Sequence, residues 1–237
     1  MLSPDALLAP CATIGDVVAR MDAIAADLDP ADGVARFNHL YRAVTVAVGE
    51  AVAAATFHDA AFLARLDVVF AGLYFRSLAG WLRDRRCARA WEPLFESRGS
   101  RRIAALQFAL AGMNAHINHD LALAVVATCA ERRVAPDDGG DVHADYLAVN
   151  GILAAQQARA KEALFDPALD RVDGALGALD DRVEHWSIVK ARDTAWRNAQ
   201  ALWTLRDLPL ARDFFLDGID RLTALAGRGL LVPLRVV

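Results

Sequence analysis

The chain has 237 residues, of which 55% are hydrophobic, and its 26 basic and 30 acidic side chains give a net charge of −4. Charges of both signs are interspersed, so no basic face indicates a nucleic-acid partner. The longest uncharged run, residues 103–119, is too short and too polar to span a membrane, and no basic residue precedes Arg20, as a secretory signal would require. The three cysteines are widely spaced and form no metal-binding pattern. We therefore expect a cytoplasmic protein with reduced thiols, whose partner is a small molecule rather than nucleic acid or a membrane.

The pattern along the chain is helical. Proline and glycine gather at a few breaks, and between the breaks apolar residues recur at intervals of three and four, with no alternating pattern that would indicate a strand. We predict a single all-α domain over 1–237, with its core in 33–226 and an exposed loop at 133–140. Seven helices are expected, over 14–28, 33–56, 60–84, 99–131, 141–164, 168–205 and 209–226. Asp59, Ser100 and Asp141 are the expected N-caps of three of them.

Two polar residues stand out in the helices expected over 33–56 and 60–84. His39, in the run RFNHLYR, is more typical of a seam between helices than of a metal site, and we keep it as a candidate for substrate binding. Asp67 is an acid inside the apolar run FLARLDVVFAGLYF, and a buried carboxylate usually has a specific partner. It either pairs with Arg42 or Arg76 as a structural element or faces the histidine of the central helix. Between these helices, we expect Asp59 to act as a cap.

The helix over 99–131 is expected to lie at the centre of the bundle, because its middle is apolar around the whole circumference. Within it, His116 and Asp120 are one turn apart on one face, lined by Met113. Asn118 lies on the opposite face, and His119 projects to the side. Polar groups placed there need partners from other helices.

His116 and Asp120 have three interpretations. The pair is a buried hydrogen bond that fixes helix packing, or the two side chains bind one metal ion together, or Asp120 orients His116 for general acid–base catalysis. A metal ion needs further ligands, and Asp67 or His39 is the candidate for completing its shell.

The helices over 141–164 and 168–205 add three features. Tyr146 and Asn150 are one turn apart and can point together toward the central helix, whereas Asp145, near the helix start, is expected to be exposed. In DDRVEHW, the acids Asp180, Asp181 and Glu184 have the DDxxE spacing that holds magnesium and diphosphate in terpene cyclases, but the companion motif of those enzymes is absent.

The runs FAGLYFRSL, LQFALAGMNAHINHDLALAVV and DYLAVNGIL resemble a family of uncharacterised helical proteins, known mainly from actinobacteria and catalogued as a domain of unknown function. The resemblance covers roughly 33–205, and AHINxDL is its most specific part. It implies one all-α domain without supplying a reaction, and it directs attention to His116, Asn118 and Asp120, with Asp145 and Asn150 behind them.

A looser resemblance concerns the motif AHINHD, which is similar to the His-x3-Asp helix of zinc-dependent phospholipases C and P1-type nucleases. Those all-helical enzymes carry a further histidine ligand a few residues on, where this chain has LALAVV. The resemblance therefore implies a reduced zinc site at most.

We expect an enzyme that acts on a small apolar or phosphorylated molecule at a buried His/Asp site, with metal-assisted hydrolysis, using zinc or magnesium, as one mechanism. The candidate residues are, for catalysis, His116, Asp120, Asn118 and Tyr146; for substrate binding, Met113, Asn150 and His39; and for a metal, His116, Asp120 and Asp67. The alternatives are a non-catalytic helical binding or interaction protein with a structural polar core, and a terpene- or polyketide-type cyclase.

Overall fold

Helices form every regular element in the computed structural model, which describes residues 2–164 and 187–233. The all-α prediction is confirmed, and no strand occurs in these ranges. The helices are α1 (Pro4–Leu8), α2 (Ile14–Asp27), α3 (Gly33–Ala53), α4 (Ala60–Asp84), α5 (Glu92–Ser97), α6 (Ala105–Ala115), α7 (Leu121–Arg132), α8 (Asp141–Leu164), α10 (Ile188–Thr204) and α11 (Pro209–Leu230). A 3-10 turn, η1 (Arg89–Trp91), precedes α5, and a π-helical segment, η2 (His116–Asp120), joins α6 to α7. The short helices α1 and α5 were not predicted.

The helix starts follow local capping chemistry, and one of the three predicted N-caps is confirmed. Asp59 accepts a hydrogen bond from the Phe62 backbone N–H at 2.8 Å, which confirms it as the N-cap of α4. Ser100 is not a cap, because α6 begins five residues later. There the Gln107 side chain accepts the Ala104 backbone N–H at 3.1 Å. Asp141 is the first residue within α8 rather than the residue before it.

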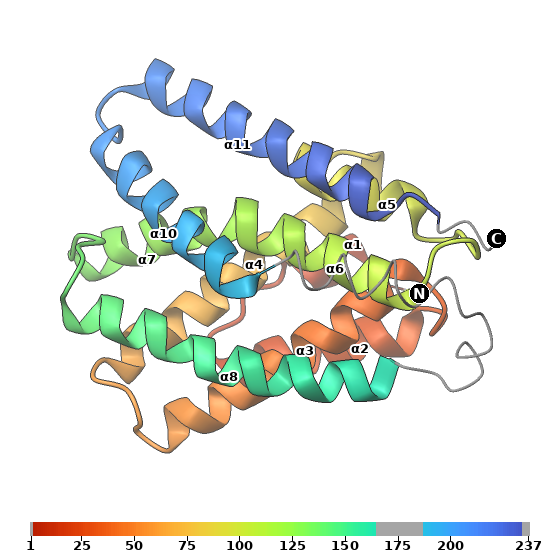
Figure 1. Cartoon of the computed structure of the whole chain (residues 1–237), viewed down its shortest axis with the longest axis horizontal. Helices are drawn as coiled ribbons and strands as arrows, with labels where there is room; N and C mark the ends of the chain where they lie inside the picture. The colour runs from red at the N-terminus through yellow and green to blue at the C-terminus, as the bar shows by residue number, and fades with distance from the viewer. Residues whose placement is uncertain (1, 165–186, 234–237) are drawn as a thin grey trace.

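The segments α6, η2 and α7 form one continuous central helix, which runs through the middle of the bundle in Figure 1. Every residue from Gln107 to Ala115 is buried. α3 and α11 pack against α6, while α4 and α10 pack against α7. The contact with α3 is close: a Cβ atom at Gly112 would lie 2.4 Å from the Phe37 ring. The prediction of a buried central helix is confirmed.

The central helix widens at η2. The Leu121 backbone N–H donates to the His116 carbonyl oxygen, five residues earlier, instead of to the residue four earlier. This wide turn contains both histidines and the aspartate that the sequence singled out.

A second polar face of the central helix holds α11. The Gln107 side-chain amide donates to two backbone carbonyls at the end of α11, at 2.7 and 2.8 Å. Asn114 donates to the Thr223 carbonyl at 2.9 Å, and Asn118 donates to the Asn114 side-chain oxygen at 3.0 Å. The hydrogen bonds of Gln107 and Asn114 thus satisfy these buried amides and attach α11 to the central helix.

In the part of the chain that the structure describes, no helix combines the length and the apolar character needed to cross a membrane.

Candidate functional site

His116 lies at the centre of the bundle with no exposed surface. Its imidazole ring is stacked on the Phe70 ring, with 3.5 Å between centroids and 5° between planes. The Tyr41 ring meets it edge-on at 4.4 Å. Aromatic side chains of α3 and α4 therefore hold the imidazole in one orientation.

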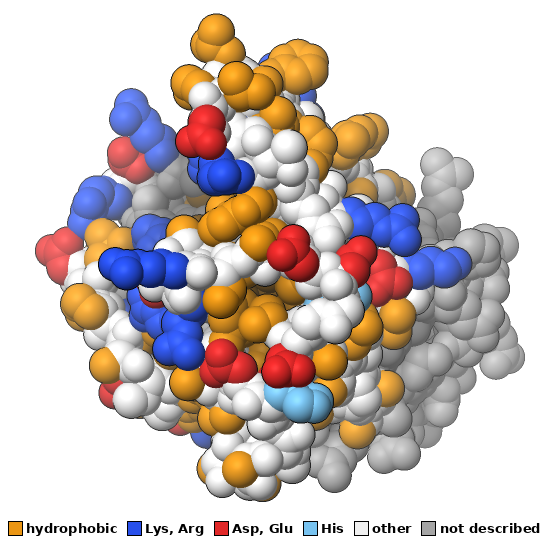
Figure 2. Space-filling model, turned by 90° about the vertical axis from the view of Figure 1, so that its left-hand side faces the viewer, with side chains coloured by type: hydrophobic (Ala, Val, Ile, Leu, Met, Phe, Trp, Pro, Cys, Tyr) orange, Lys and Arg blue, Asp and Glu red, His pale blue; other side chains and the backbone are white. Residues whose placement is uncertain are grey.

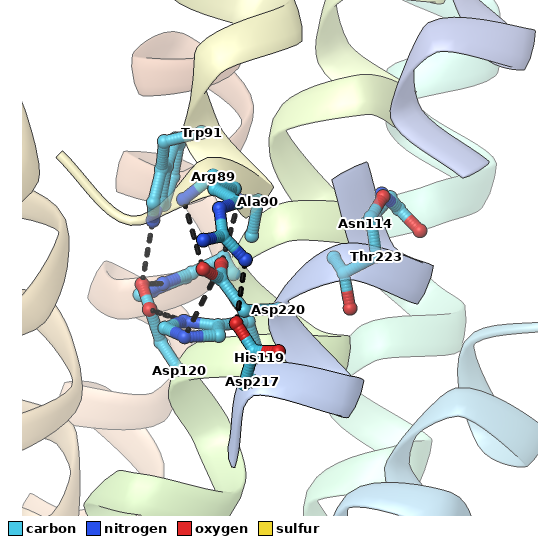
Figure 3. Close-up of polar contacts among 10 residues, drawn as sticks. Arg89, Ala90, Trp91, Asn114, His119, Asp120, Asp217, Asp220 and Thr223 are labelled. Carbon is cyan, nitrogen blue, oxygen red and sulfur yellow. Dashed lines mark hydrogen bonds and ion pairs between the residues drawn. The ribbon is translucent and has the colours of Figure 1, made fainter. Parts of the chain in front are cut away.

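A shared carboxylate connects the two histidines of η2 (Figure 3). Asp120 Oδ2 accepts hydrogen bonds from His116 Nδ1 and from the Trp91 indole N–H, both at 3.0 Å. Asp120 Oδ1 lies 2.7 Å from His119 Nδ1. Because Nδ1 of His116 donates to the carboxylate, its Nε2 is left unprotonated in the neutral ring.

The network continues to the surface through α11. His119 Nε2 lies 3.6 Å from Asp220 Oδ1, and Asp220 accepts the backbone N–H groups of Arg89 and Ala90 at 3.2 and 2.8 Å. Side-chain exposure rises along the series, from 1% for His116 and Asp120 to 11% for His119 and 18% for Asp220. Imidazoles and carboxylates alternate along this route from the buried centre to solvent.

The charge states follow from burial and hydrogen bonding. Burial lowers the pKa of His116 more than the Asp120 carboxylate raises it, so the ring is neutral. Burial also lowers the pKa of His119, but its hydrogen bond to Asp120 and the charges of Asp120 and Asp220 outweigh this and raise it. For Asp120, burial raises the pKa, and the two imidazole hydrogen bonds outweigh that and keep it below its usual value.

A cavity of about 60 Å³ adjoins His116. Its lining is mainly apolar, comes from α3, α4, the central helix, α8 and α10, and includes Met113. Buried atoms of three polar side chains that line it, Tyr41 Oη, Asp67 Oδ2 and His116 Nε2, have no hydrogen-bond partner. Buried polar atoms are nearly always satisfied, so three in one cavity require an explanation.

Asp67 lines this cavity together with His116. Arg42, one of its two expected partners, instead binds Asp22, with 3.1 Å between Nη2 and Oδ2. Burial raises the pKa of Asp67 to about 7. The carboxyl group is therefore protonated at mildly acidic pH and half ionised near neutrality.

Tyr146 and Asn150 act through Arg192, a buried cation of α10 that also lines the cavity. The guanidinium donates to the Asn150 side-chain oxygen at 2.7 Å and to the Tyr146 carbonyl oxygen at 2.5 Å, and it lies 4.1 Å above the Tyr146 ring centroid. The Tyr146 hydroxyl donates to the Arg192 carbonyl at 2.7 Å. Both predicted residues thus position Arg192 rather than line the cavity themselves.

Two predicted site residues lie elsewhere. His39 is exposed, because Phe37, Asn38 and Tyr41 take the inward positions of α3. Asn118 faces α11 through Asn114, as described above, and is not part of the cavity lining.

The expectation that Asp145 is exposed is wrong. It is 2% exposed and accepts the backbone N–H groups of His58 and Asp59 at 2.9 and 2.6 Å, together with the His58 ring at 2.8 Å. The carboxylate thereby connects α8 to the start of α4.

The metal interpretation finds a small donor set. Asp120 and His116 Nδ1 are hydrogen-bonded to one another. Of the three predicted metal ligands, this leaves the second ring nitrogen of His116 and the Asp67 carboxyl group, whose side chains both line the cavity. Within the described ranges, no three histidine, cysteine or acidic side chains come together as metal ligands. Asp180 and Glu184, of the cyclase interpretation, lie outside the described residues.

Sequence reasoning missed Tyr41, Phe70, Trp91 and Arg192 and gave no role to Asp220. One local signal was available for Trp91, since a buried indole N–H needs an acceptor. The remaining contacts join segments far apart in the chain, so no local pattern reveals them.

The sequence model of a family described as "Family of unknown function (DUF5995)" matches residues 14–233. No curated protein matches the chain significantly, and no solved structure does.

Proposed function

Since the chain belongs to this family of unknown function (DUF5995), whose description assigns no reaction, we propose from the site alone that it is an acid–base enzyme acting on a small, mainly apolar molecule. The observation that carries the proposal is that three side chains lining one cavity, Tyr41, Asp67 and His116, each have a buried polar atom without a hydrogen-bond partner. A bound molecule with a polar group would satisfy them.

His116 is the base. Its Nε2 lone pair has no hydrogen-bond partner, its tautomer is fixed by Asp120, and its orientation is held by the Phe70 stack. A neutral imidazole in an apolar site accepts a proton from a bound molecule without first losing one of its own. Asp120 is a positioning residue, because it acts through His116.

Asp67 is the acid. A carboxyl group whose pKa is near 7 still carries its proton at neutral pH in about half of the molecules, and it can protonate an oxygen that gains negative charge. The reaction is therefore a proton transfer: a C–H or O–H proton moves to His116 Nε2, its electron pair shifts within the molecule toward an oxygen, and Asp67 or Tyr41 donates to that oxygen.

The proton taken up by His116 has a route to solvent. The series Asp120, His119 and Asp220 leads from the buried ring to the surface by alternating carboxylates and imidazoles. This supports repeated turnover at a base that water does not reach directly.

The lining favours an apolar molecule over a phosphorylated one. Among the described residues that line the cavity, the cationic side chain is Arg192. Its guanidinium already donates hydrogen bonds to Asn150 and Tyr146, so it is not free to bind a phosphate group. The metal-free mechanism is favoured as well, because the predicted metal ligands that line the cavity are two, His116 and Asp67, and a metal ion needs more.

A test uses acetone, a probe of about the cavity's size, in deuterated water, with the exchange followed by mass spectrometry. A base removes one methyl C–H proton, the electron pair shifts to the carbonyl oxygen, which Asp67 protonates, and the enol takes up deuterium on carbon as the carbonyl re-forms. We expect the wild type to accelerate this reaction and His116→Gln to lower kcat/KM by about 100-fold. Asp67→Asn should lower the rate less and remove its decline as Asp67 ionises above pH 7.

His39→Gln is the matched control, because it changes an exposed imidazole of the same bundle. Circular dichroism shows that each variant is folded. If His116→Gln keeps the wild-type rate, His116 is not the base. If the probe binds in the cavity and is never turned over, the alternative of a non-catalytic binding protein replaces the enzyme.

A further inference from the structure

The outer face of α11 is apolar although it faces solvent. α11 lies at the edge of the bundle in Figure 1 and packs on α6 and η1 through its inner face, where Thr223 and Ala224 are buried. On the opposite side, Phe214 is 82% exposed, Leu222 69% and Leu225 67%. Figure 2 shows hydrophobic side chains gathered at the top of the molecule, where α11 begins. A surface helix normally turns charged residues outward.

Five residues form what we name the outer stripe: Ala211, Phe214, Gly218, Leu222 and Leu225. At about 100° per residue their directions fall within an arc of about 80°, and no charged residue of α11 points into that arc. A Cβ atom at Gly218 would have no neighbour within 4 Å, so the middle of the stripe is open.

The outer stripe is symmetric about Gly218. Its other members lie seven and four residues before it and four and seven residues after it (218 − 7, 218 − 4, 218 + 4, 218 + 7). In an antiparallel pair with a two-fold axis at Gly218, Phe214 of each copy meets Leu222 of the other, and Ala211 meets Leu225. The small Ala211 opposes the large Leu225, Phe214 and Leu222 pack large against large, and the glycine at the axis allows the two backbones to approach closely.

From this self-complementary pattern, we propose that the outer stripe binds the outer stripe of a second copy of this chain, forming an antiparallel two-fold dimer. The flanking charges fit the same register. The position opposite Arg221 is 215 (436 − 221), two residues from Asp217, and Arg221 and Asp217 point to the same side of the outer stripe, so these oppositely charged side chains of different copies lie within one turn. Within each copy they already pair at 2.8 Å, with side chains 66% and 39% exposed, and the dimer places this pair beside the same pair of the second copy.

The dimer dissociates readily. From Ala211 to Leu225 the outer stripe extends about 21 Å, and one helix from each copy buries less surface than a standard specific interface. The dimer therefore forms in the micromolar range rather than the nanomolar range.

Sedimentation velocity tests the proposal by measuring the mass of the protein as a function of its concentration. We expect the wild-type weight-average mass to rise from monomer toward dimer between about 1 and 200 µM, and Phe214→Glu and Leu222→Glu to stay monomeric throughout. Leu147→Glu is the matched control, because Leu147 is an exposed apolar residue of another helix, at 39% exposure. A wild type that remains monomeric at every concentration, or Glu variants that dimerise as it does, would overturn the proposal.

Disulfide capture tests the register. Gly218→Cys places a thiol on the two-fold axis, whereas Gly229→Cys places one on the same open face but opposite position 207 (436 − 229). Under mild oxidation we expect Gly218→Cys to form covalent dimers at least about tenfold faster than Gly229→Cys, with the wild type run alongside for its own cysteines. Equal rates would refute the antiparallel register.

Discussion

Replacing Asp67 with asparagine should stabilise the protein, and only above mildly acidic pH. Burial holds the folded pKa at about 7, against an ordinary value of 3.8. Between these two values the unfolded chain binds fewer protons than the folded one, so the free energy of unfolding falls as pH rises. The fall is about 1.4 kcal/mol per pH unit, and about 4 kcal/mol is lost once the pH exceeds 7. Asparagine does not ionise and escapes this loss.

Urea unfolding followed by tryptophan fluorescence, at several pH values from 4 to 8, gives the two stability curves. The difference between Asp67→Asn and wild type should grow across that range by about 4 kcal/mol and then level off above the folded pKa. Asp207→Asn, at an acid whose side chain is 84% exposed, is the control for a surface charge. Parallel curves for Asp67→Asn and wild type would mean that Asp67 is ionised and paired in the folded protein, and the acid role would fail with it.

Three further changes test the surroundings of the site. Trp91→Phe removes the indole donor 3.0 Å from Asp120 and should lower the unfolding free energy by about 1.5–3 kcal/mol, measured by urea denaturation. Gly112→Ala places a methyl group 2.4 Å from the Phe37 ring and should cost about 1–3 kcal/mol, seen as a Tm several degrees lower by calorimetry; an unchanged Tm would show that α3 and α6 separate freely. Burial would raise the pKa of Asp145, but its backbone and imidazole hydrogen bonds outweigh this and lower it. Its contribution is therefore present above the unfolded pKa and is lost as pH falls through the folded one, so Asp145→Asn should destabilise at pH 7 and much less near pH 3.

The architecture was predictable because its signals are local. An apolar segment with charges only at its ends becomes the central helix, and an aspartate before an apolar run, Asp59, becomes a cap. His116 and Asp120 share a face for the same reason, since helix geometry fixes their relation. The prediction for Ser100 was wrong because a turn follows it and the helix begins only at Ala105. A serine is compatible with a helix start but does not by itself determine one.

The partners of the site were not predictable. Phe70, Trp91 and Arg192 reach His116, Asp120 and the cavity from other helices, and their contacts depend on how those helices cross. The importance of His119 was underestimated because a regular helix directs it away from Asp120's face. Both lie in the wide turn, where His119 Nδ1 is 2.7 Å from Asp120 Oδ1, and the helical pattern of the sequence does not indicate that turn.

The wide turn at η2 accommodates one residue more than a regular helix would, without changing the rotational phase of the helix that follows. Five π-helical residues turn through about the same angle as four α-helical ones, so deleting Asn118 would restore regular winding and leave Val125 and Cys129, now fully buried, in the core. The same deletion would shorten the separation of His116 and Asp120 from four residues to three. A change in helix length at this one turn therefore alters the imidazole–carboxylate couple while the seating of half the bundle is kept.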